Sequence, residues 1–180
     1  MNPLMRELIS AQGLASSPVM APILAQAGLD GDPRRWWGVD WVEVANGGYR
    51  PVAEGGRAAA IIGVWRHGGL LDLLATSLET RAMRRRKNLA SILGEENVDV
   101  SLKSGKPLEV CVDGVSWLAR GRKGVVILDW DQADCCLRDV PAFSCQTDEL
   151  ALRLKRLFDG GWGLRPPIFV PTAKERRDAA

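Results

Sequence analysis

Histidine is nearly absent from this 180-residue sequence, in which His67 is the single one. A Cys–His or Ser–His nucleophilic pair would have to use it, yet no G-x-S-x-G elbow or comparable nucleophile motif is present. The glycine pairs form neither a G-x-G-x-x-G fingerprint nor a P-loop, so neither of these nucleotide-binding loops is indicated. The sequence therefore names no reaction, and whether the protein is an enzyme stays open, with a non-enzymatic role favoured.

Long hydrophobic runs are missing as well. No apolar segment approaches the roughly 18 residues of a membrane-spanning helix. Met5, Arg6 and Glu7 interrupt the start of the chain, where a signal peptide would place its apolar centre. We therefore expect a cytoplasmic protein without a membrane partner.

Cysteine is sparse, and its spacing includes no C-x-x-C pair. With one histidine in the chain, the cysteines predict neither a zinc finger nor a thioredoxin-like site. Because free cysteine is among the most buried residue types, we expect reduced and mostly buried thiols. The cysteines are Cys111, Cys135, Cys136 and Cys145.

The composition is typical of a globular domain, with 46% hydrophobic and 26% charged residues. The 24 basic and 22 acidic residues give a net charge of +2, so the charge of the whole molecule does not indicate a polyanionic partner. A nucleic-acid site would have to rest on a local basic cluster.

By its patterns, the chain divides into a helical arm over 1–30, an α/β body over 31–165 and an extended tail over 166–180. The arm keeps helical spacing of its apolar residues and ends in a loop rich in glycine and aspartate. The tail is held extended by its prolines.

The first half of the body changes from strand to helix patterns. Alternation over 37–52 around a turn at 46–48 predicts a β-hairpin. Residues 58–65 form an apolar run between glycine pairs and predict a buried strand. Residues 70–93 are the longest helical candidate, as one helix or as two that separate near 77–80.

The second half of the body predicts strands at 108–113, 125–130 and 142–145, followed by a capped amphipathic helix at 147–158. Two structures compete between the first two of these strands: a tight hairpin at Asp-Gly, or a short helix that crosses over to a parallel strand. The run VVIL is typical of a strand covered on both faces and favours the parallel alternative. We predict an α/β fold with a small mixed sheet, flanking helices, an N-terminal helical arm and an edge β-hairpin.

Acidic residues follow the run VVIL. Asp129 ends that strand, where open α/β sheets carry ligand sites, and Asp131 points to the same side. Asp113 ends the preceding strand, so the three carboxylates could share one Mg²⁺ ion. The alternative is a buried strand that leaves the core through a turn, in which aspartates accept hydrogen bonds.

The motifs VCVDG at 110–114 and VVILDWD at 125–131 resemble the Toprim domains of primases and topoisomerases. The resemblance implies Mg²⁺-dependent phosphodiester chemistry at Asp113, Asp129 and Asp131. Two features depart from the family pattern. An aspartate stands at 113 in place of a glutamate, and only fifteen residues separate Asp113 from Asp129.

A basic run falls within the segment predicted to be helical. At three- and four-residue spacing, several of its guanidinium groups would share one helix face and could contact neighbouring phosphates. The alternative is a solvated helix face, balanced by nearby glutamates. The run consists of Arg81, Arg84, Arg85, Arg86 and Lys87.

Tryptophan is abundant, with seven residues, and Trp36, Trp37 and Trp41 lie close together. Tryptophan is enriched at interface hot spots and stacks on nucleobases, so these residues could form a protein interface or contact nucleic acid. Packing in the core is the alternative, because alternation places Trp37 and Trp41 on one face of a strand.

Three hypotheses follow. The first is a non-enzymatic cytoplasmic binding or accessory protein that contacts nucleic acid through the arginine-rich helix. The second is a degenerate Toprim-like Mg²⁺-binding domain of the DNA-replication or primase type, and the third is a protein–protein adaptor that uses the tryptophans. No cofactor is expected unless the second hypothesis holds, and the oligomeric state is open.

Overall fold

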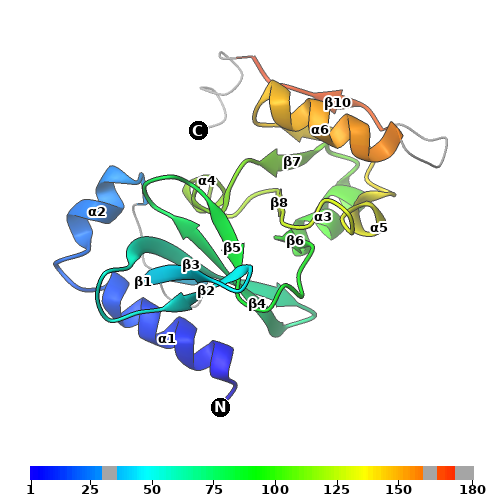
Figure 1. The fold of residues 1–180 in the computed structure, drawn as a ribbon. Helices are drawn as coiled ribbons and strands as arrows, with labels where there is room; N and C mark the ends of the chain where they lie inside the picture. Colours follow the sequence, from blue (N-terminus) through cyan, green and yellow to red (C-terminus); the bar gives the residue numbers. More distant parts are fainter. Residues whose placement is uncertain (30–35, 160–165, 173–180) are drawn as a thin grey trace. The chain divides into compact units, whose positions relative to one another are not determined.

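The computed structural model describes residues 1–29, 36–159 and 166–172, which contain six helices and ten strands (Figure 1). The predicted α/β class with flanking helices is confirmed, and the described strands form two sheets rather than one small sheet. The predicted boundaries of arm, body and tail lie within or beside segments outside the described residues, so they stay predictions.

The chain forms two compact units. Unit 1 consists of Met1–Ala90 and Asp113–Ala119, and unit 2 consists of Ser91–Val112 and Arg120–Ala180. The chain thus passes through unit 2 twice and returns to unit 1 between the two passages for one short helix.

The described residues of unit 1 form an antiparallel sheet of five strands in the order β2-β1-β3-β4-β5. Two-residue turns with positive φ, Asn46–Gly47 and His67–Gly68, join β1 to β2 and β3 to β4. Such type I′ turns match the twist of paired strands. The predicted edge hairpin is confirmed, because β2 is an outer strand. The strands are β1 (Trp37–Ala45), β2 (Gly48–Pro51), β3 (Arg57–Arg66), β4 (Gly69–Ser77) and β5 (Met83–Arg85).

The unit 1 sheet is strongly curved. β2 and β5 are its two outer strands, yet a Cβ atom on Gly48 of β2 would lie 2.7 Å from the carbonyl oxygen of Arg85 in β5. Only glycine permits such a close approach of two backbones. The two edges of the sheet therefore come close to each other.

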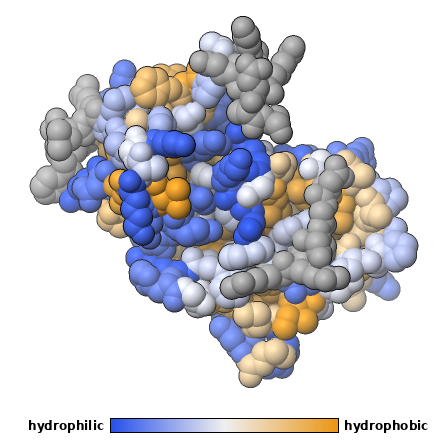
Figure 2. All heavy atoms as spheres, turned by 180° about the vertical axis from the view of Figure 1, so that it is seen from behind, coloured by the Kyte–Doolittle hydropathy of each residue, from blue (hydrophilic) through white to orange (hydrophobic). Residues whose placement is uncertain are grey.

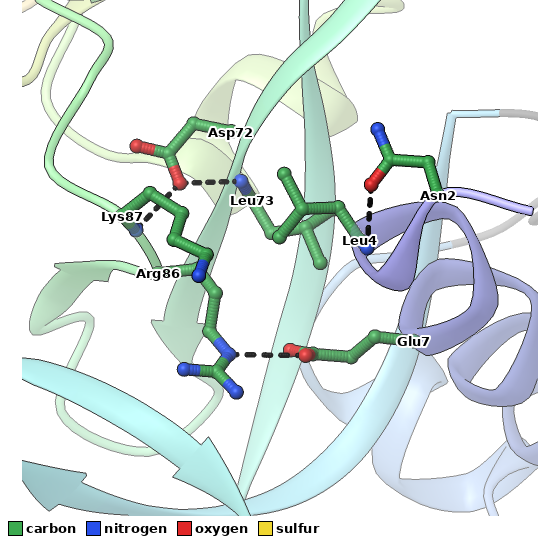
Figure 3. Close-up of polar contacts among 7 residues, drawn as sticks. All are labelled: Asn2, Leu4, Glu7, Asp72, Leu73, Arg86 and Lys87. Carbon is green, nitrogen blue, oxygen red and sulfur yellow. Dashed lines mark hydrogen bonds and ion pairs between the residues drawn. The ribbon is translucent and has the colours of Figure 1, made fainter.

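Helix α1 (Pro3–Ala15) packs on one face of this sheet, which we call the α1 face (Figure 1). Asn2 caps the helix, since its Oδ1 atom accepts a hydrogen bond from the N–H of Leu4 at 3.0 Å (Figure 3). A second, shorter helix, α2 (Ala21–Gln26), follows. The N-terminal segment is thus helical, as predicted. The α1 residues buried against the sheet are Leu4, Leu8 and Ala11.

The opposite face of the sheet contacts helix α4 (Gly114–Ala119), the returning part of unit 1. A Cβ atom on Gly114 would lie 2.6 Å from the side chains of Ile62 and Thr76, so glycine allows the helix to pack closely. Asp113 caps this helix. Its Oδ1 atom accepts from the N–H of Ser116 at 2.8 Å, and its Oδ2 atom accepts from the Ser116 hydroxyl at 3.0 Å.

The helix predicted over 70–93 is wrong, because most of this segment forms strands β4 and β5. Leu73 and Leu74 are both fully buried, although they point to opposite faces of β4. One face of β4 contacts α1 and the other contacts α4, so its apolar residues show no alternation and imitate a helical stripe. The arginine-rich segment consequently lies on β5 and in the turns beside it, not on a helix.

The described residues of unit 2 form a mixed sheet in the order β10-β9-β7-β8-β6. All its pairs are parallel except that of β6 with β8. The parallel pair β7 and β8 confirms the predicted crossover through a helix and excludes the hairpin. The elements are β6 (Ile92–Leu93), α3 (Glu96–Ser104), β7 (Leu108–Cys111), β8 (Val125–Ile127), α5 (Asp134–Leu137), β9 (Phe143–Cys145), α6 (Asp148–Asp159) and β10 (Ile168–Phe169).

Helix α6 is close to the helix predicted at 147–158. The Oγ1 atom of Thr147 accepts a hydrogen bond from the N–H of Leu150 at 3.2 Å, as expected of a cap. Leu154 is fully buried and packs in the unit 2 core beside Phe143. The strands at 108–113, 125–130 and 142–145 are also confirmed, each somewhat shorter than predicted.

Among the described residues, no helix combines the length and the apolar character that crossing a bilayer requires. On the face drawn in Figure 2, hydrophobic residues form several separate groups among hydrophilic ones.

The close packing of α1 on β1 can be tested at two glycines. A Cβ atom on Gly38 would clash with the α1 backbone at Ala11 and Gln12, whereas one on Gly13 would meet nothing within 4 Å. We expect Gly38→Ala to lower the free energy of unfolding by about 1–3 kcal/mol. Gly13→Ala, within α1, should raise it by up to about 1 kcal/mol through helix propensity. Urea denaturation measures both, and equal effects of the two variants would contradict this packing.

Candidate functional site: a groove on the α1 face

A groove lies on the α1 face of the unit 1 sheet and encloses about 440 Å³. Because the sheet is curved, all five strands contribute to its lining. We call it the sheet groove. Its lining residues are Val42, Glu43, Val44, Tyr49, Gly55, Arg57, Ala59, Ala75, Ser77, Thr80, Ala82 and Arg84.

Strand register explains the shape of the groove. Residues paired across antiparallel strands point to the same face. The floor carries Ala59 and Ala75, which are buried and extend only a methyl group, so the sheet is hollow there. At the other end of the same face, Ile61 and Leu73 are larger and are packed against α1. The pairs that form the groove are Val42 with Arg57, Ala59 with Ser77, and Ala75 with Arg84.

The charged side chains of the groove are mostly basic. Arg57 and Arg84 are exposed, and they stand on β3 and β5, on either side of the alanine floor. Glu43 is the acidic residue of the lining, and its carboxylate forms an ion pair with Arg50. Its charge is therefore largely balanced, and the groove presents two guanidinium groups to a ligand.

The predicted basic run divides into structural and exposed residues. Arg81 donates a hydrogen bond to the carbonyl of Ala27 at 3.2 Å, and Arg85 donates to the carbonyl of Ala90 at 2.7 Å. The exposed Arg84 donates a local hydrogen bond, to the carbonyl of the preceding Met83 at 2.8 Å. Arg84 is the residue of the run that lines the sheet groove.

Asp72 fixes the segment that follows β5. This carboxylate is fully buried and accepts three backbone hydrogen bonds. Its Oδ1 atom accepts from Leu73 and Lys87, both at 2.8 Å (Figure 3). Its Oδ2 atom accepts from Leu89 at 2.9 Å. Since β5 pairs with β4 over only three residues, this anchor holds the strand in place beyond its own ladder.

Arg86 connects the same segment to α1. Its Nε atom donates to the Glu7 carboxylate at 3.0 Å (Figure 3), and its guanidinium carbon lies 5.8 Å from the centre of the Tyr49 ring. Burial, followed by the negative charge of Glu7, raises the pKa of Tyr49 well above its usual value. The phenol therefore stays neutral at physiological pH and acts as part of the wall.

The predicted tryptophan interface is split by the structure. Trp37 is buried in the unit 1 core, and Trp36 packs edge-to-face on Trp65 with ring centres 5.8 Å apart. Trp41 is partly exposed and lines a second cavity of about 550 Å³, beside Ile23 and Ala27. Packing in the core is confirmed for Trp37, and an interface at the other two stays a prediction.

The three predicted metal ligands fall in different units. Asp113 belongs to unit 1, where both of its carboxylate oxygens are engaged by Ser116. Asp129 and Asp131 belong to unit 2 and follow β8, and the N–H of Asp131 donates to Oδ1 of Asp129 at 3.1 Å. This bond is the turn that the alternative interpretation expected. Within the described ranges, no three His, Cys, Asp or Glu side chains are grouped to hold a metal ion, and Mg²⁺ binding stays a prediction.

Comparisons with protein-family models, curated proteins and solved structures found no match. The geometry of the sheet groove is therefore the basis for a functional proposal. The sequence pattern indicated Arg84 but not Arg57 or the alanine floor. One signal was available in the sequence. Arg57, Ala59 and Ile61 alternate along one strand, so a charged, a small and a large apolar side chain follow one another on the same face.

The anchoring role of Asp72 gives a stability test. Asp72→Ala leaves three backbone N–H groups without their acceptor, so we expect a loss of at least about 2 kcal/mol in the free energy of unfolding. Asp72→Asn keeps one carbonyl oxygen and should lose less. Asp139→Asn, at an exposed position, is the matched control.

Urea denaturation and amide hydrogen exchange at Lys87 and Leu89 measure this effect. Faster exchange of both amides in the alanine variant is expected. Unchanged stability and exchange in that variant would show that the carboxylate does not hold the segment.

Proposed function

We propose that unit 1 is a non-enzymatic binding module whose ligand is single-stranded nucleic acid, held over the sheet groove. The observation that carries this proposal is the pair of exposed guanidinium groups, Arg57 and Arg84, on either side of an apolar floor on one face of the sheet. The chain would then serve as an accessory protein that holds a strand for other components.

The spacing of the two arginines favours a polymer over a single anion. β4 separates their strands, so their backbones are at least roughly 10 Å apart across the sheet. A ligand with repeated phosphates satisfies both guanidinium groups at once, each of which binds a phosphate through two parallel hydrogen bonds. The apolar floor between them accepts the sugar and base of the intervening nucleotide.

The size of the groove favours a single strand over a duplex. A hollow of about 440 Å³ admits groups of nucleotide size but not a double helix. Three lining residues carry hydroxyl groups: Tyr49, Ser77 and Thr80. Tyr49 is only 2% exposed, which leaves the hydroxyl groups of Ser77 and Thr80 for a ligand. With few groups to read base edges and no exposed ring in the lining to stack on, we expect binding that depends little on sequence.

The proposal predicts binding that depends on salt and on both arginines. A fluorescently labelled single-stranded oligonucleotide should bind in anisotropy titrations, and its affinity should fall between about 50 and about 200 mM salt. Arg57→Ala combined with Arg84→Ala should weaken binding about tenfold or more. It should also make the log–log salt slope shallower by about 1.4, because each lost phosphate contact removes about 0.7.

A variant of equal charge provides the control. Arg6→Ala combined with Arg156→Ala removes two exposed arginines outside the groove and should leave affinity nearly unchanged. If both double variants weaken oligonucleotide binding equally, the affinity depends on the overall charge and not on the arginines of the groove. Absence of saturable binding at low salt would contradict the proposed function.

A further inference from the structure

Two adjacent cysteines in unit 2 form a pair that the proposed function does not use. Helix α5 carries Cys135, which is exposed, and Cys136, which is partly buried, with their sulfur atoms 3.7 Å apart. Cys111 and Cys145 are buried, whereas the sequence predicted that most of the cysteines would be. The expectation of buried thiols is therefore wrong at Cys135.

Local contacts hold the two sulfur atoms side by side. The thiol of Cys135 donates to the carbonyl of Gln132 at 3.0 Å, and the Cys136 sulfur lies 3.6 Å from the Ser91 hydroxyl. Each sulfur therefore has a second polar neighbour besides the other sulfur.

A disulfide between these residues is disfavoured by backbone geometry. Consecutive Cα atoms lie about 3.8 Å apart, whereas the Cα atoms of disulfide-bonded cysteines are usually about 4.4–6.8 Å apart. A sulfur–sulfur bond of about 2.04 Å would also require the two sulfurs to approach from 3.7 Å within a helical turn. A single atom that bridges the sulfurs avoids this strain.

The number and separation of the thiols select the kind of bridging atom. If one atom binds both sulfurs at about 2.3 Å, as zinc binds thiolates, the sulfur separation of 3.7 Å gives a sulfur–atom–sulfur angle of about 107°. A linear two-coordinate ion would need the sulfurs about 4.6 Å apart, at twice that bond length. A tetrahedral structural ion needs four ligands, and in the part of the chain that the structure describes no third His, Cys, Asp or Glu joins the pair.

We propose that Cys135 and Cys136 form a two-thiol site for a monosubstituted trivalent arsenical. Such a pyramidal centre is completed by two protein sulfurs and its own organic group, so it needs no further protein ligand. In the reaction with R–As=O, two S–H bonds and the arsenic–oxygen bond break, and two As–S bonds form. The oxygen leaves as water with both thiol protons. Arsenic stays trivalent, so neither an oxidant nor a reductant takes part.

The Cys135 thiol enters this exchange in its protonated form. Desolvation raises the pKa of the Cys135 thiol above its usual value, and so do the neighbouring Cys136 sulfur and the negative charge of Asp134. This thiol therefore carries its proton at neutral pH, and it loses that proton to the departing water when its As–S bond forms.

Phenylarsine oxide tests the site directly. With the full chain and an excess of a monothiol such as 2-mercaptoethanol, intact-mass spectrometry should show one phenylarsenic group per chain. Cys135→Ser and Cys136→Ser should each lower retention at least about 100-fold, because the second As–S bond is intramolecular only in the pair. Far-UV circular dichroism checks that each variant is folded.

Alkylation of the unmodified chain provides a readout that does not depend on variants. Iodoacetamide should label Cys135 before treatment with the arsenical and should label neither member of the pair afterwards. Equal retention by the single-serine variants, or protection mapped to Cys111 or Cys145, would overturn the proposal. Formation of a Cys135–Cys136 disulfide with diamide that proceeds as readily as arsenical capture would also overturn it.

Discussion

The buried carboxylate of Asp72 is the constraint on which the arrangement of unit 1 depends. It accepts three backbone hydrogen bonds with full burial, and two of the three donors, Lys87 and Leu89, follow β5. A carboxylate is tolerated inside a protein only when its oxygens accept hydrogen bonds. Asp72 therefore requires the segment after β5 to lie beside it, and that segment requires Asp72 as its acceptor. The short strand β5 is thereby held beside β4, and Arg84 is held at the groove.

The sheet groove follows from that placement together with side-chain size. The closure of β5 toward β2 depends on Gly48, and the hollow depends on alanine at 59 and 75, where larger residues would fill the floor. The guanidinium group of Arg86 binds the Glu7 carboxylate, and that of Arg85 donates to the carbonyl of Ala90. Both contacts stabilise the β5 edge of the sheet. The basic run therefore has two roles, and the residues that support the strand are not the ones that face the groove.

Much of the fold could be predicted from local signals, and the failures have physical causes. The hairpin around Asn46, the strand VVIL and the capped helix at Thr147 carry turn, burial or capping chemistry in a few adjacent residues. The helix prediction over 70–93 was wrong because β4 is covered on both faces. Its side chains are apolar on both sides, so they lack the alternation that identifies a strand. Alternation along one strand indicates Arg57 and Ala59, but the groove as a whole requires the register of five strands and was not predictable. The exposure of Cys135 beside Cys136 was not predictable either.

We propose that a single strand of nucleic acid occupies the sheet groove, and amide chemical-shift mapping can detect that occupancy residue by residue. When an unlabelled oligonucleotide is titrated into the ¹⁵N-labelled chain, the account predicts that shifts concentrate at the groove residues, including Val44, Arg57, Ala75 and Arg84. The exposed helix α6 of unit 2 should show no comparable shifts. Saturable binding with shifts confined to residues outside the groove would contradict the account.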